Sequence, residues 1–331
     1  MVVQNWIEVI QTANLSKDKE MDPVSKWLII VRAAVFSMTL TSALIGGLLA
    51  AAAGSFSWTP FLLATTGLLL AHAANNMIND YYDLSGGVDT ADYPRALYAP
   101  HPILSGLVTK ATLRNAILLV NFIDVVIAAY LVSLRGWPVV VFAGLGFFIS
   151  FFYVAPPIRL KHIGLGEIGV FLVWGPLMTG GTYYVTAGNI PAWVFVASIP
   201  YAIVVMTVLM GKHLDKFELD KVKGIHTLPV ILGYDTARYA TMALMIAFYF
   251  VVLGMVAAGT LGVWTLLVVF SLPRLFRVLK IYSQPKPDAP PKNFPVWPLW
   301  YVAAAFYLTK LAGGLFILGL VLNLILPGRL F

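Results

Sequence analysis

Long apolar stretches separated by short polar segments run along almost the whole chain. A helix of about 20 apolar residues is long enough to cross the roughly 30 Å hydrocarbon core of a bilayer. Nine stretches approach or exceed this length, so the pattern predicts an all-α, polytopic membrane protein. The predicted spans are residues 27–53, 59–82, 113–134, 138–155, 164–187, 192–211, 237–259, 261–282 and 296–326.

The segments outside these spans are short. Residues 1–25 lack the basic region followed by a short apolar stretch that begins a secretory signal, so we expect a retained N-terminal segment. Residues 283–298 contain six prolines, which predicts a linker between the last two spans. We therefore expect residues 1–331 to form a single membrane-embedded domain.

Basic residues concentrate on one predicted side of the membrane. The N-terminal segment and alternate loops carry 19 of the 22 Lys and Arg residues, whereas the opposite side has only Arg135 and Arg329, and Lys310 lies within the last span. Lys and Arg are retained on the cytoplasmic side. The pattern predicts a cell-membrane protein with a cytoplasmic N-terminus and its C-terminus across the membrane, because an even number of spans would remove the asymmetry.

Composition agrees with a lipid-embedded chain. Hydrophobic residues make up 60% and charged residues 11%, against about 25% charged residues in soluble proteins. The absence of cysteine excludes disulfides, thiolate metal sites and thiol nucleophiles. The net charge of +7 follows from the cytoplasmic loops, so we expect no nucleic-acid partner.

The second span ends in a row of polar residues. His72, Asn76, Asp80 and Asp83 are each about one helical turn apart and share one face, and Asn79 lies beside it. The acids continue into an acid-rich loop, at about 79–112, as Asp89 and Asp92. Amides and carboxylates at the end of a membrane helix are unfavourable unless they face a wet cavity or a cation. The alternative is a polar helix end with an ordinary Asn or Asp cap.

A second acid-rich loop, at about 212–236, follows the sixth span. It alternates acids with lysines: Lys212, Asp215, Lys216, Glu218, Asp220, Lys221 and Lys223. A solvated charged loop is the alternative interpretation. Each acid-rich loop follows the second helix of a four-helix set, however, and both are predicted to be cytoplasmic. This placement indicates two related halves with facing acid clusters.

Carboxylates mixed with Lys and Arg favour one ligand, a magnesium diphosphate. Mg²⁺ takes oxygen ligands, usually one or two carboxylates together with phosphate oxygens and water. Arg and Lys neutralise the remaining phosphate charge, and an apolar bundle below suits a hydrocarbon tail. The residues thus indicate an amphiphilic diphosphate substrate without identifying its reaction.

At these two loops the chain resembles the UbiA-type superfamily of intramembrane aromatic prenyltransferases. Its first motif, Asn-Asp-x-x-Asp, is matched by Asn79, Asp80 and Asp83, and residues 101–106 are similar to a following family stretch. The end of its second motif is matched by Asp220, Gly224, Thr227 and Gly233. The resemblance covers about residues 25–325. It implies nine transmembrane helices around a central cavity capped by cytoplasmic loops, with Mg²⁺-diphosphate between the acid clusters.

The resemblance also implies the site residues. The catalytic acids are Asp80, Asp83, Asp215 and Asp220, and the metal ligands are these four with Asp89 and Glu218. The substrate contacts are Arg32, Asn76, Asn79, Arg95, Tyr153, Lys161, Lys212 and Lys216. Many family members have an acid where this chain has Gly87, so Asp89 is the substitute. Asp215 and Asp220 are five apart rather than four, which leaves open whether the turn takes an extra residue or Glu218 assists.

Residues 151–188 look most like the 1,4-dihydroxy-2-naphthoate prenyltransferases of menaquinone synthesis. The similarity lies in Gly164 to Glu167, in Trp174-Gly175-Pro176 and in Gly181 to Val185. It implies a polyprenyl donor, geranylgeranyl diphosphate or longer, and a small aromatic acceptor. Prenyl transfer to a glycerol-phosphate lipid is the alternative reaction. A secondary transporter is the non-enzyme alternative, but transporters place their acids at the bilayer midplane rather than at one edge.

Overall fold

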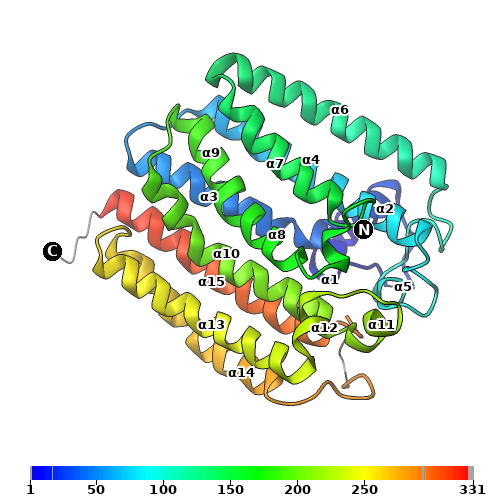
Figure 1. Cartoon of the computed structure of the whole chain (residues 1–331). Coiled ribbons are helices and arrows are strands. Elements are labelled where there is room, and N and C mark those ends of the chain that lie inside the picture. Colours follow the sequence, from blue (N-terminus) through cyan, green and yellow to red (C-terminus); the bar gives the residue numbers. More distant parts are fainter. Residues whose placement is uncertain (1, 17, 293, 295, 327–331) are drawn as a thin grey trace.

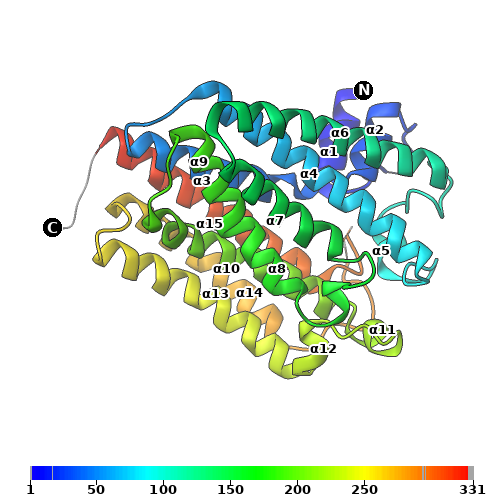
Figure 2. The same cartoon turned by 45° about the horizontal axis from the view of Figure 1, so that its top comes forward.

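A bundle of long, roughly parallel and antiparallel helices makes up most of the protein (Figures 1 and 2). The computed structural model describes residues 2–16, 18–292, 294 and 296–326, and these residues form helices but no strand. The N-terminal half comprises α1 (Val2–Thr12), α2 (Pro23–Ile30), η1 (Ala33–Val35), α3 (Phe36–Ala52), α4 (Trp58–Ser85), α5 (Pro94–Tyr98), α6 (Lys110–Arg135), α7 (Pro138–Phe152) and η2 (Leu160–His162). The C-terminal half comprises α8 (Gly166–Leu172), η3 (Val173–Leu177), α9 (Met178–Ala187), α10 (Ala192–Leu214), α11 (Phe217–Val222), α12 (Leu228–Leu232), α13 (Tyr234–Ala257), η4 (Val263–Ser271), α14 (Leu272–Tyr282) and α15 (Trp300–Ile325).

Six helical stretches among the described residues are long and apolar enough to cross a membrane, which confirms a multi-pass membrane protein. They are Ala33–Ala52, α4, α6, α10, α13 and α15. The other three predicted spans are short or irregular. Helix α7 has 15 residues, the α8–α9 stretch contains a π-helical turn with Pro176 inside it, and η4 is a 3₁₀ helix that leads into α14.

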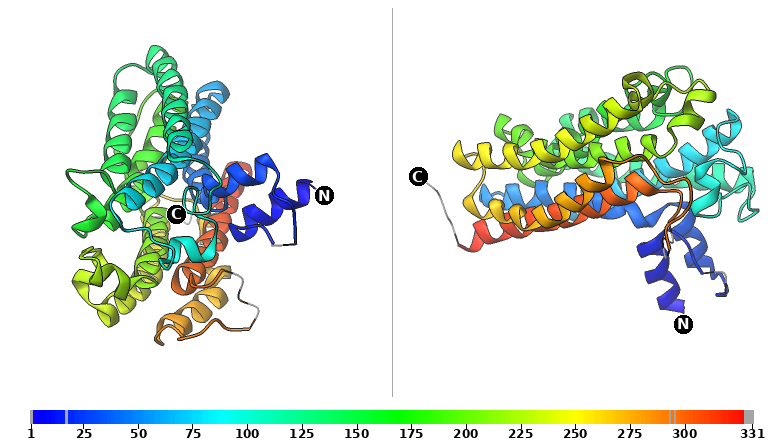
Figure 3. Two further views of the ribbon diagram at one scale, coloured as in Figure 1. Left: turned by 90° about the vertical axis from the view of Figure 1, so that its right-hand side faces the viewer. Right: turned by 90° about the horizontal axis from the view of Figure 1, so that it is seen from below.

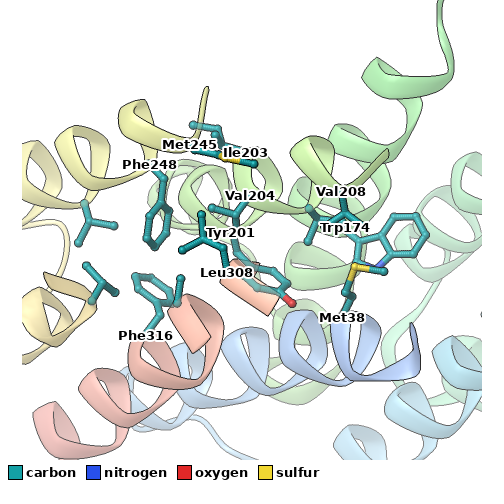
Figure 4. Close-up of a cluster of buried hydrophobic side chains, with 14 of the residues drawn as sticks. Met38, Trp174, Tyr201, Ile203, Val204, Val208, Met245, Phe248, Leu308 and Phe316 are labelled. Carbon is teal, nitrogen blue, oxygen red and sulfur yellow. The ribbon is translucent and has the colours of Figure 1, made fainter. Parts of the chain in front are cut away.

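Helix α10 lies at the centre of the bundle. Figure 4 shows Tyr201, Val204 and Val208 of α10 among side chains from surrounding helices, including Phe248 of α13 and Phe316 of α15. By contrast, α6 is largely exposed, as a helix facing lipid would be. The apolar side chains on its outer surface, such as Phe122, would contact the acyl chains.

Two glycines permit close helix contacts around α10. A Cβ on Gly175 would lie 2.5 Å from the Cβ of Ala202, so η3 can approach α10 only without a side chain there. A Cβ on Gly211 would lie 2.9 Å from the backbone carbon of Tyr301 at the start of α15. Small residues permit such close contacts between membrane helices. The second contact brings the C-terminal end of α10 against the first turn of α15.

Both acid-rich loops lie at the same end of the bundle. Figures 1 and 2 place α5, from the first loop, near α11 and α12, from the second, and α15 ends at the opposite end. Helices α1 and α2 project from the bundle near the loop end (Figure 3). The Trp6 indole donates a hydrogen bond of 2.9 Å to Asp22, the N-cap of α2, which joins these two helices. The orientation of this bundle in a membrane remains a prediction.

Candidate functional site

A small charged chamber lies where the two acid-rich loops meet. Its charged lining consists of five basic side chains and two carboxylates. These residues are Arg32, Arg95, Lys161, Lys212, Lys216, Asp83 and Asp89. Two further carboxylates, Asp80 and Asp220, pair with these basic residues from behind the lining, which leaves a surplus of one positive charge. The five basic residues were predicted as substrate contacts and the two lining acids as metal ligands. The folded chain therefore brings into one chamber residues that are up to 184 positions apart.

Asp80 holds two arginines at the chamber wall. It is fully buried, and its carboxylate accepts hydrogen bonds of 2.9 and 2.8 Å from Nε and Nη2 of Arg95. Arg32 pairs with the same carboxylate. Bidentate Arg–carboxylate pairs fix both geometry and charge. Asp80 was predicted as a metal ligand, but in this arrangement both of its oxygens already bind guanidinium groups, so it orients the two arginines.

Arg32 reaches the chamber from an unusual backbone conformation. It lies between α2 and η1 with a φ of 54°, a left-handed value that is uncommon outside glycine. The Asn76 side chain donates a hydrogen bond of 2.9 Å to the carbonyl of Val31 and so supports this turn. Asn76 thus acts through the position of Arg32, whereas Asn79 lines the chamber itself.

Asp83 pairs with a lysine from a different segment. The Lys161 ammonium, in η2, lies 2.6 Å from each carboxylate oxygen of Asp83. Both side chains are buried. A parallel bridge between Ile163 and His226 connects the loop that carries Lys161 to the second acid-rich loop. The ion pair is therefore held by backbone contacts between loops as well as by charge.

Asp89 is oriented by a histidine. Nε2 of His101 lies 3.3 Å from its Oδ2, and Nδ1 of His101 faces the N–H groups of Ile103 and Leu104 at 3.3 Å each. Nδ1 is thus an acceptor, so the proton is on Nε2, the nitrogen that lies 3.3 Å from Asp89. Burial alone would raise the pKa of Asp89, but the His101 contact and the charge of Arg32 hold it below its ordinary value. Asp89 is therefore a carboxylate.

The second acid-rich loop contributes Asp220, which contacts the first loop. The Tyr93 hydroxyl donates a hydrogen bond of 2.5 Å to Oδ1 of Asp220, and Lys216 donates one of 2.8 Å to the Tyr93 oxygen. Burial opposes the charge on Asp220, but the adjacent Lys216 ammonium keeps the pKa of Asp220 below its usual value. Lys216 is likewise buried, yet Asp220 raises its pKa. The two loops thus meet through a Tyr–Asp–Lys cluster.

Asp215 and Glu218, both predicted as metal ligands, do not line the chamber and, unlike Asp220, contact none of the lining acids or Tyr93. The Asp215 carboxylate accepts hydrogen bonds of 2.9 and 3.0 Å from the backbone N–H groups of Tyr301 and Val302. It therefore caps the N-terminus of α15. Glu218 is exposed on α11. The extra residue in the motif puts Lys216, rather than Asp215, four positions before Asp220, where the two side chains pair.

Sequence reasoning missed a buried polar chain behind Tyr153. The Tyr153 hydroxyl lies 3.2 Å from Nε2 of His213, and Nδ1 of His213 lies 2.5 Å from a carboxylate oxygen of Glu167. The sequence offers one indication of this polar chain, because Glu167 is the one charged residue in the predicted span 164–187. Tyr93 and His101 were also missed, although both lie in the first acid-rich loop.

Two larger cavities continue from the chamber into the bundle. A cavity of about 200 Å³ shares Arg32, Asn79, Arg95 and Lys212 with the chamber. A second cavity of about 470 Å³ shares His72, Asn75 and Trp174 with the first. Most other lining residues are apolar. The three spaces therefore form a series from a charged end to a mostly apolar interior, and the chamber with the cavity beside it suits a ligand with an anionic head and a hydrocarbon tail.

The carboxylates at the chamber fit a divalent cation. Oδ2 of Asp89 and Oδ2 of Asp220 are buried and lack a hydrogen bond of good geometry among the described residues, because His101 Nε2 and the Lys216 ammonium approach them only to 3.3 Å. Such oxygens, together with phosphate oxygens and water, are the ligands that Mg²⁺ prefers. One oxygen each from Asp80 and Asp89 and a nitrogen of His101 also lie within 4.8 Å of one another. The Nε2 proton of His101 and the arginines on Asp80 make this second set a poorer fit.

Comparison with known proteins gives the family and the fold. Residues 39–301 match the model of the UbiA prenyltransferase family. The chain is 25% identical over 224 residues to 1,4-dihydroxy-2-naphthoate octaprenyltransferase of Bacillus subtilis, a match that covers 68% of this chain and 71% of the relative. It is 26% identical over 260 residues to 2-carboxy-1,4-naphthoquinone phytyltransferase of Synechocystis, with 76% and 78% covered.

Solved structures share the fold at low sequence identity. A UbiA homologue from Aeropyrum pernix has a TM-score of 0.65 and 17% identity, with 87% of this chain and 97% of that chain covered. A UbiA homologue from Archaeoglobus fulgidus bound to GPP and Mg²⁺ has a TM-score of 0.60 and 16% identity, with 88% and 99% covered. The fold of the whole bundle is therefore shared with these proteins.

Proposed function

We propose, because this chain belongs to the UbiA prenyltransferase family, that it transfers a polyprenyl group from an allylic diphosphate to an aromatic quinone precursor in the membrane. The observation that carries this proposal is the charged chamber with its surplus of positive charge, which leads into a mostly apolar cavity beside it. This arrangement supports a donor with its diphosphate in the chamber and its hydrocarbon chain in the bundle. We expect geranylgeranyl diphosphate or a longer donor.

The chamber supports ionisation of the donor. When the C–O bond between the allylic carbon and the diphosphate breaks, the leaving group gains negative charge, and fixed cations stabilise that charge. Lys212 is suited to this role because, among the described residues, no carboxylate lies within ion-pair distance of it, unlike the other four cations. Arg32 and Arg95 are held in place by Asp80.

We assign the metal site to Asp83, Asp89 and Asp220, with Mg²⁺ as the cofactor. Bound there, Mg²⁺ would supply charge stabilisation to the diphosphate oxygens. The Oδ2 atoms of Asp89 and Asp220 support this assignment, because both are buried and accept no hydrogen bond of good geometry among the described residues. Asp83 joins them at the chamber, where Lys161 offsets its charge. Asp215 and Glu218 are not part of the proposed metal site, because Asp215 caps α15 and Glu218 is exposed.

The acceptor is proposed from the relatives. The Bacillus subtilis and Synechocystis proteins are named for naphthoate and naphthoquinone substrates, and we propose 1,4-dihydroxy-2-naphthoate for this chain. Once the diphosphate has left, the ring carbon that bears the carboxyl attacks the allylic cation. The new C–C bond breaks the aromaticity of the ring, and loss of the carboxylate as CO₂ returns the electron pair to it. Closely packed apolar walls keep water from the allylic cation.

We further propose nine membrane crossings, with α7, the α8–α9 stretch and the η4–α14 stretch as the three irregular ones. This count agrees with the acid-rich loops at one end of the bundle and the end of α15 at the other. Nine crossings, together with the excess of Lys and Arg in the loops at the N-terminal side, support a cytoplasmic N-terminus.

The proposed function is tested with the purified full-length protein. It is incubated with Mg²⁺, geranylgeranyl diphosphate and separate acceptors, namely 1,4-dihydroxy-2-naphthoate, 4-hydroxybenzoate and geranylgeranylglyceryl phosphate, and the products are identified by mass spectrometry. We expect a prenylated naphthoquinol. A product with the glyceryl phosphate and none with the aromatic acceptors would reject the aromatic acceptor but keep the donor chemistry. No product with any acceptor would reject the proposal.

A further inference from the structure

The larger intramembrane cavity has a wall of unusually small side chains. It lies between α4, α6, α7 and the η3–α9 stretch and has a volume of about 470 Å³. Gly67 and Ala71 of α4, Ala128 of α6, Gly144 of α7 and Gly181 of α9 all line it. Small residues leave room next to the backbone, so the sequence itself keeps this space open. The space is large enough to hold a bicyclic aromatic molecule.

Four polar side chains that line this cavity have an atom without a hydrogen-bond partner among the described residues. These atoms are Oδ1 of Asn75, Oδ1 of Asp124, Nε1 of Trp174 and Oγ1 of Thr182. Trp174 and Thr182 are more than nine-tenths buried. Buried polar atoms in proteins are nearly always paired, and the bilayer interior offers them no water. A hydrocarbon tail in this cavity would leave all four unpaired.

We propose that this cavity binds the ring of the aromatic acceptor through its oxygen substituents, an inference that rests on the proposed function. The four groups match such a ring. Asn75 and Asp124 offer oxygens that accept hydrogen bonds from ring hydroxyls, the Trp174 N–H donates to a ring oxygen, and Thr182 can do either. No other part of either substrate offers comparable partners, because the donor's polar atoms are confined to its diphosphate.

The four unpaired polar groups lie at two different depths in the larger cavity. Asn75 and Trp174 also line the smaller cavity next to the chamber, so a ring held by them lies beside the allylic carbon of the donor. Thr182 is eight residues after Trp174, about 12 Å further along the stretch at 1.5 Å per residue. Asp124 faces α4 near Gly67, where an added Cβ would lie 3.5 Å from its Oδ1. The Asn75–Trp174 pair thus holds the ring for reaction, and Asp124 and Thr182 hold it deeper in the cavity.

Binding of an air-stable analogue tests the inference without depending on turnover. Equilibrium dialysis of 1-hydroxy-2-naphthoate is carried out with the full-length protein in detergent, for wild type, Trp174→Phe and Asp124→Leu. We expect about tenfold weaker binding in each variant, the effect of one lost hydrogen bond to a buried partner. The affinity of Asp124→Leu for geranylgeranyl thiodiphosphate, an unreactive donor analogue, should stay the same, because Asp124 lines only the larger cavity.

Two matched variants control for changes outside the cavity. Trp193→Phe removes an indole that packs on Tyr183 outside the cavity lining, and Val126→Leu changes an exposed position of α6. Neither should alter naphthoate binding, and melting temperatures of all variants show that each is folded. If Asp124→Leu unfolds the chain, the inference is tested with Trp174→Phe and Thr182→Val. These two substitutions preserve the side-chain volume more closely.

The outcomes separate this inference from the proposed function. Unchanged naphthoate affinity in Trp174→Phe and Asp124→Leu would overturn it, as would tighter donor binding in Asp124→Leu, which would mean that the prenyl tail fills the cavity. If the wild type binds the naphthoate but transfers no prenyl group, the binding site stands and the proposed function fails. If the variants transfer the prenyl group with an unchanged KM for the acceptor, the function stands and this inference fails.

Discussion

Asp215 accepts a hydrogen bond of 2.9 Å from the backbone N–H of Tyr301, 86 residues further along the chain. Val302 donates to the other carboxylate oxygen, and the Lys286 ammonium lies 3.5 Å from the first. One carboxylate thus joins the end of α10, the proline-rich linker and the start of α15. Asp215 lies one residue before Lys216 in the second acid-rich loop, yet it serves the packing of the bundle.

Asp215→Ala should lower stability more than it lowers the intrinsic rate. Loss of a helix cap costs about 1–2 kcal/mol, and the variant also leaves Lys286 without its carboxylate. We expect a lower melting temperature in detergent, with turnover by the folded fraction within a few-fold of wild type. The reverse pattern, unchanged melting and no turnover, would return Asp215 to the metal site.

The same carboxyl predicts a pH dependence of stability. Burial raises the pKa of Asp215 to about 6, despite the nearby charge of Lys286. Because the folded pKa lies above the unfolded value of about 3.9, the folded state binds the proton more tightly. This contribution is full below about pH 4 and is lost as pH rises through about 6. The stability advantage of wild type over Asp215→Asn should therefore shrink between pH 4 and 7, as thermal unfolding of both proteins would show; an advantage that grows over this range would contradict it.

Asp83→Asn and Asp220→Asn should each reduce prenyl transfer at least about 100-fold in saturating Mg²⁺, because each removes charge that holds the cation at the leaving group. Asp83 lines the chamber and Asp220 contacts Tyr93 and Lys216, which line it. Neither belongs to the apolar core, so the variants should remain folded. Glu218→Gln, exposed on α11, is the matched control in the same loop and should retain the wild-type rate. A near-normal rate in Asp220→Asn would remove Asp220 from the metal site.

Lys212→Ala should raise the KM for the donor about 10- to 100-fold, the effect of losing a charged hydrogen bond to the diphosphate. The KM for the acceptor should change little. Lys221→Ala removes an exposed charge from the same loop and serves as the control. Equal effects of the two substitutions would mean that Lys212 acts only through the general charge of this end of the protein.

The proximity of the acids in the first cluster could be predicted because Asp80 and Asp83 lie on one continuous helix. Asp80 and Asp83 are on the same face of α4, so spacing alone brings them together. Their partners could not be predicted in the same way. Lys161 meets Asp83 through the folding of a loop 78 residues away, and only the three-dimensional arrangement shows that Asp80 binds Arg95.

The second cluster was harder to predict because one extra residue changes which side chain faces the site. Each added residue rotates a helical position by about 100°. Lys216 therefore takes the place expected for an acid, and Asp215 turns toward α15. Likewise, hydrophobicity predicted the span at 164–187, but it could not show the π-helical turn at Trp174, which depends on Pro176 and on the contact between Gly175 and Ala202.

Topology can be tested independently of activity. A cysteine placed at Ser16, before the first span, should react with a membrane-impermeant maleimide only from the cytoplasmic side. A cysteine at Ser57, between α3 and α4, should react only from the other side. The chain has no native cysteine, so labelling is specific. Labelling of both positions from one side would contradict the proposed topology.

The central claim is a prenyl transfer in which the naphthoate loses its carboxyl group. The most direct test supplies 1,4-dihydroxy-2-naphthoate with a ¹³C-labelled carboxyl, geranylgeranyl diphosphate and Mg²⁺, and measures labelled CO₂ and prenylated product in the same reaction. The account predicts one CO₂ per product for wild type and neither for Asp83→Asn. A prenylated product that keeps its labelled carboxyl, or full product formation by Asp83→Asn, would contradict it.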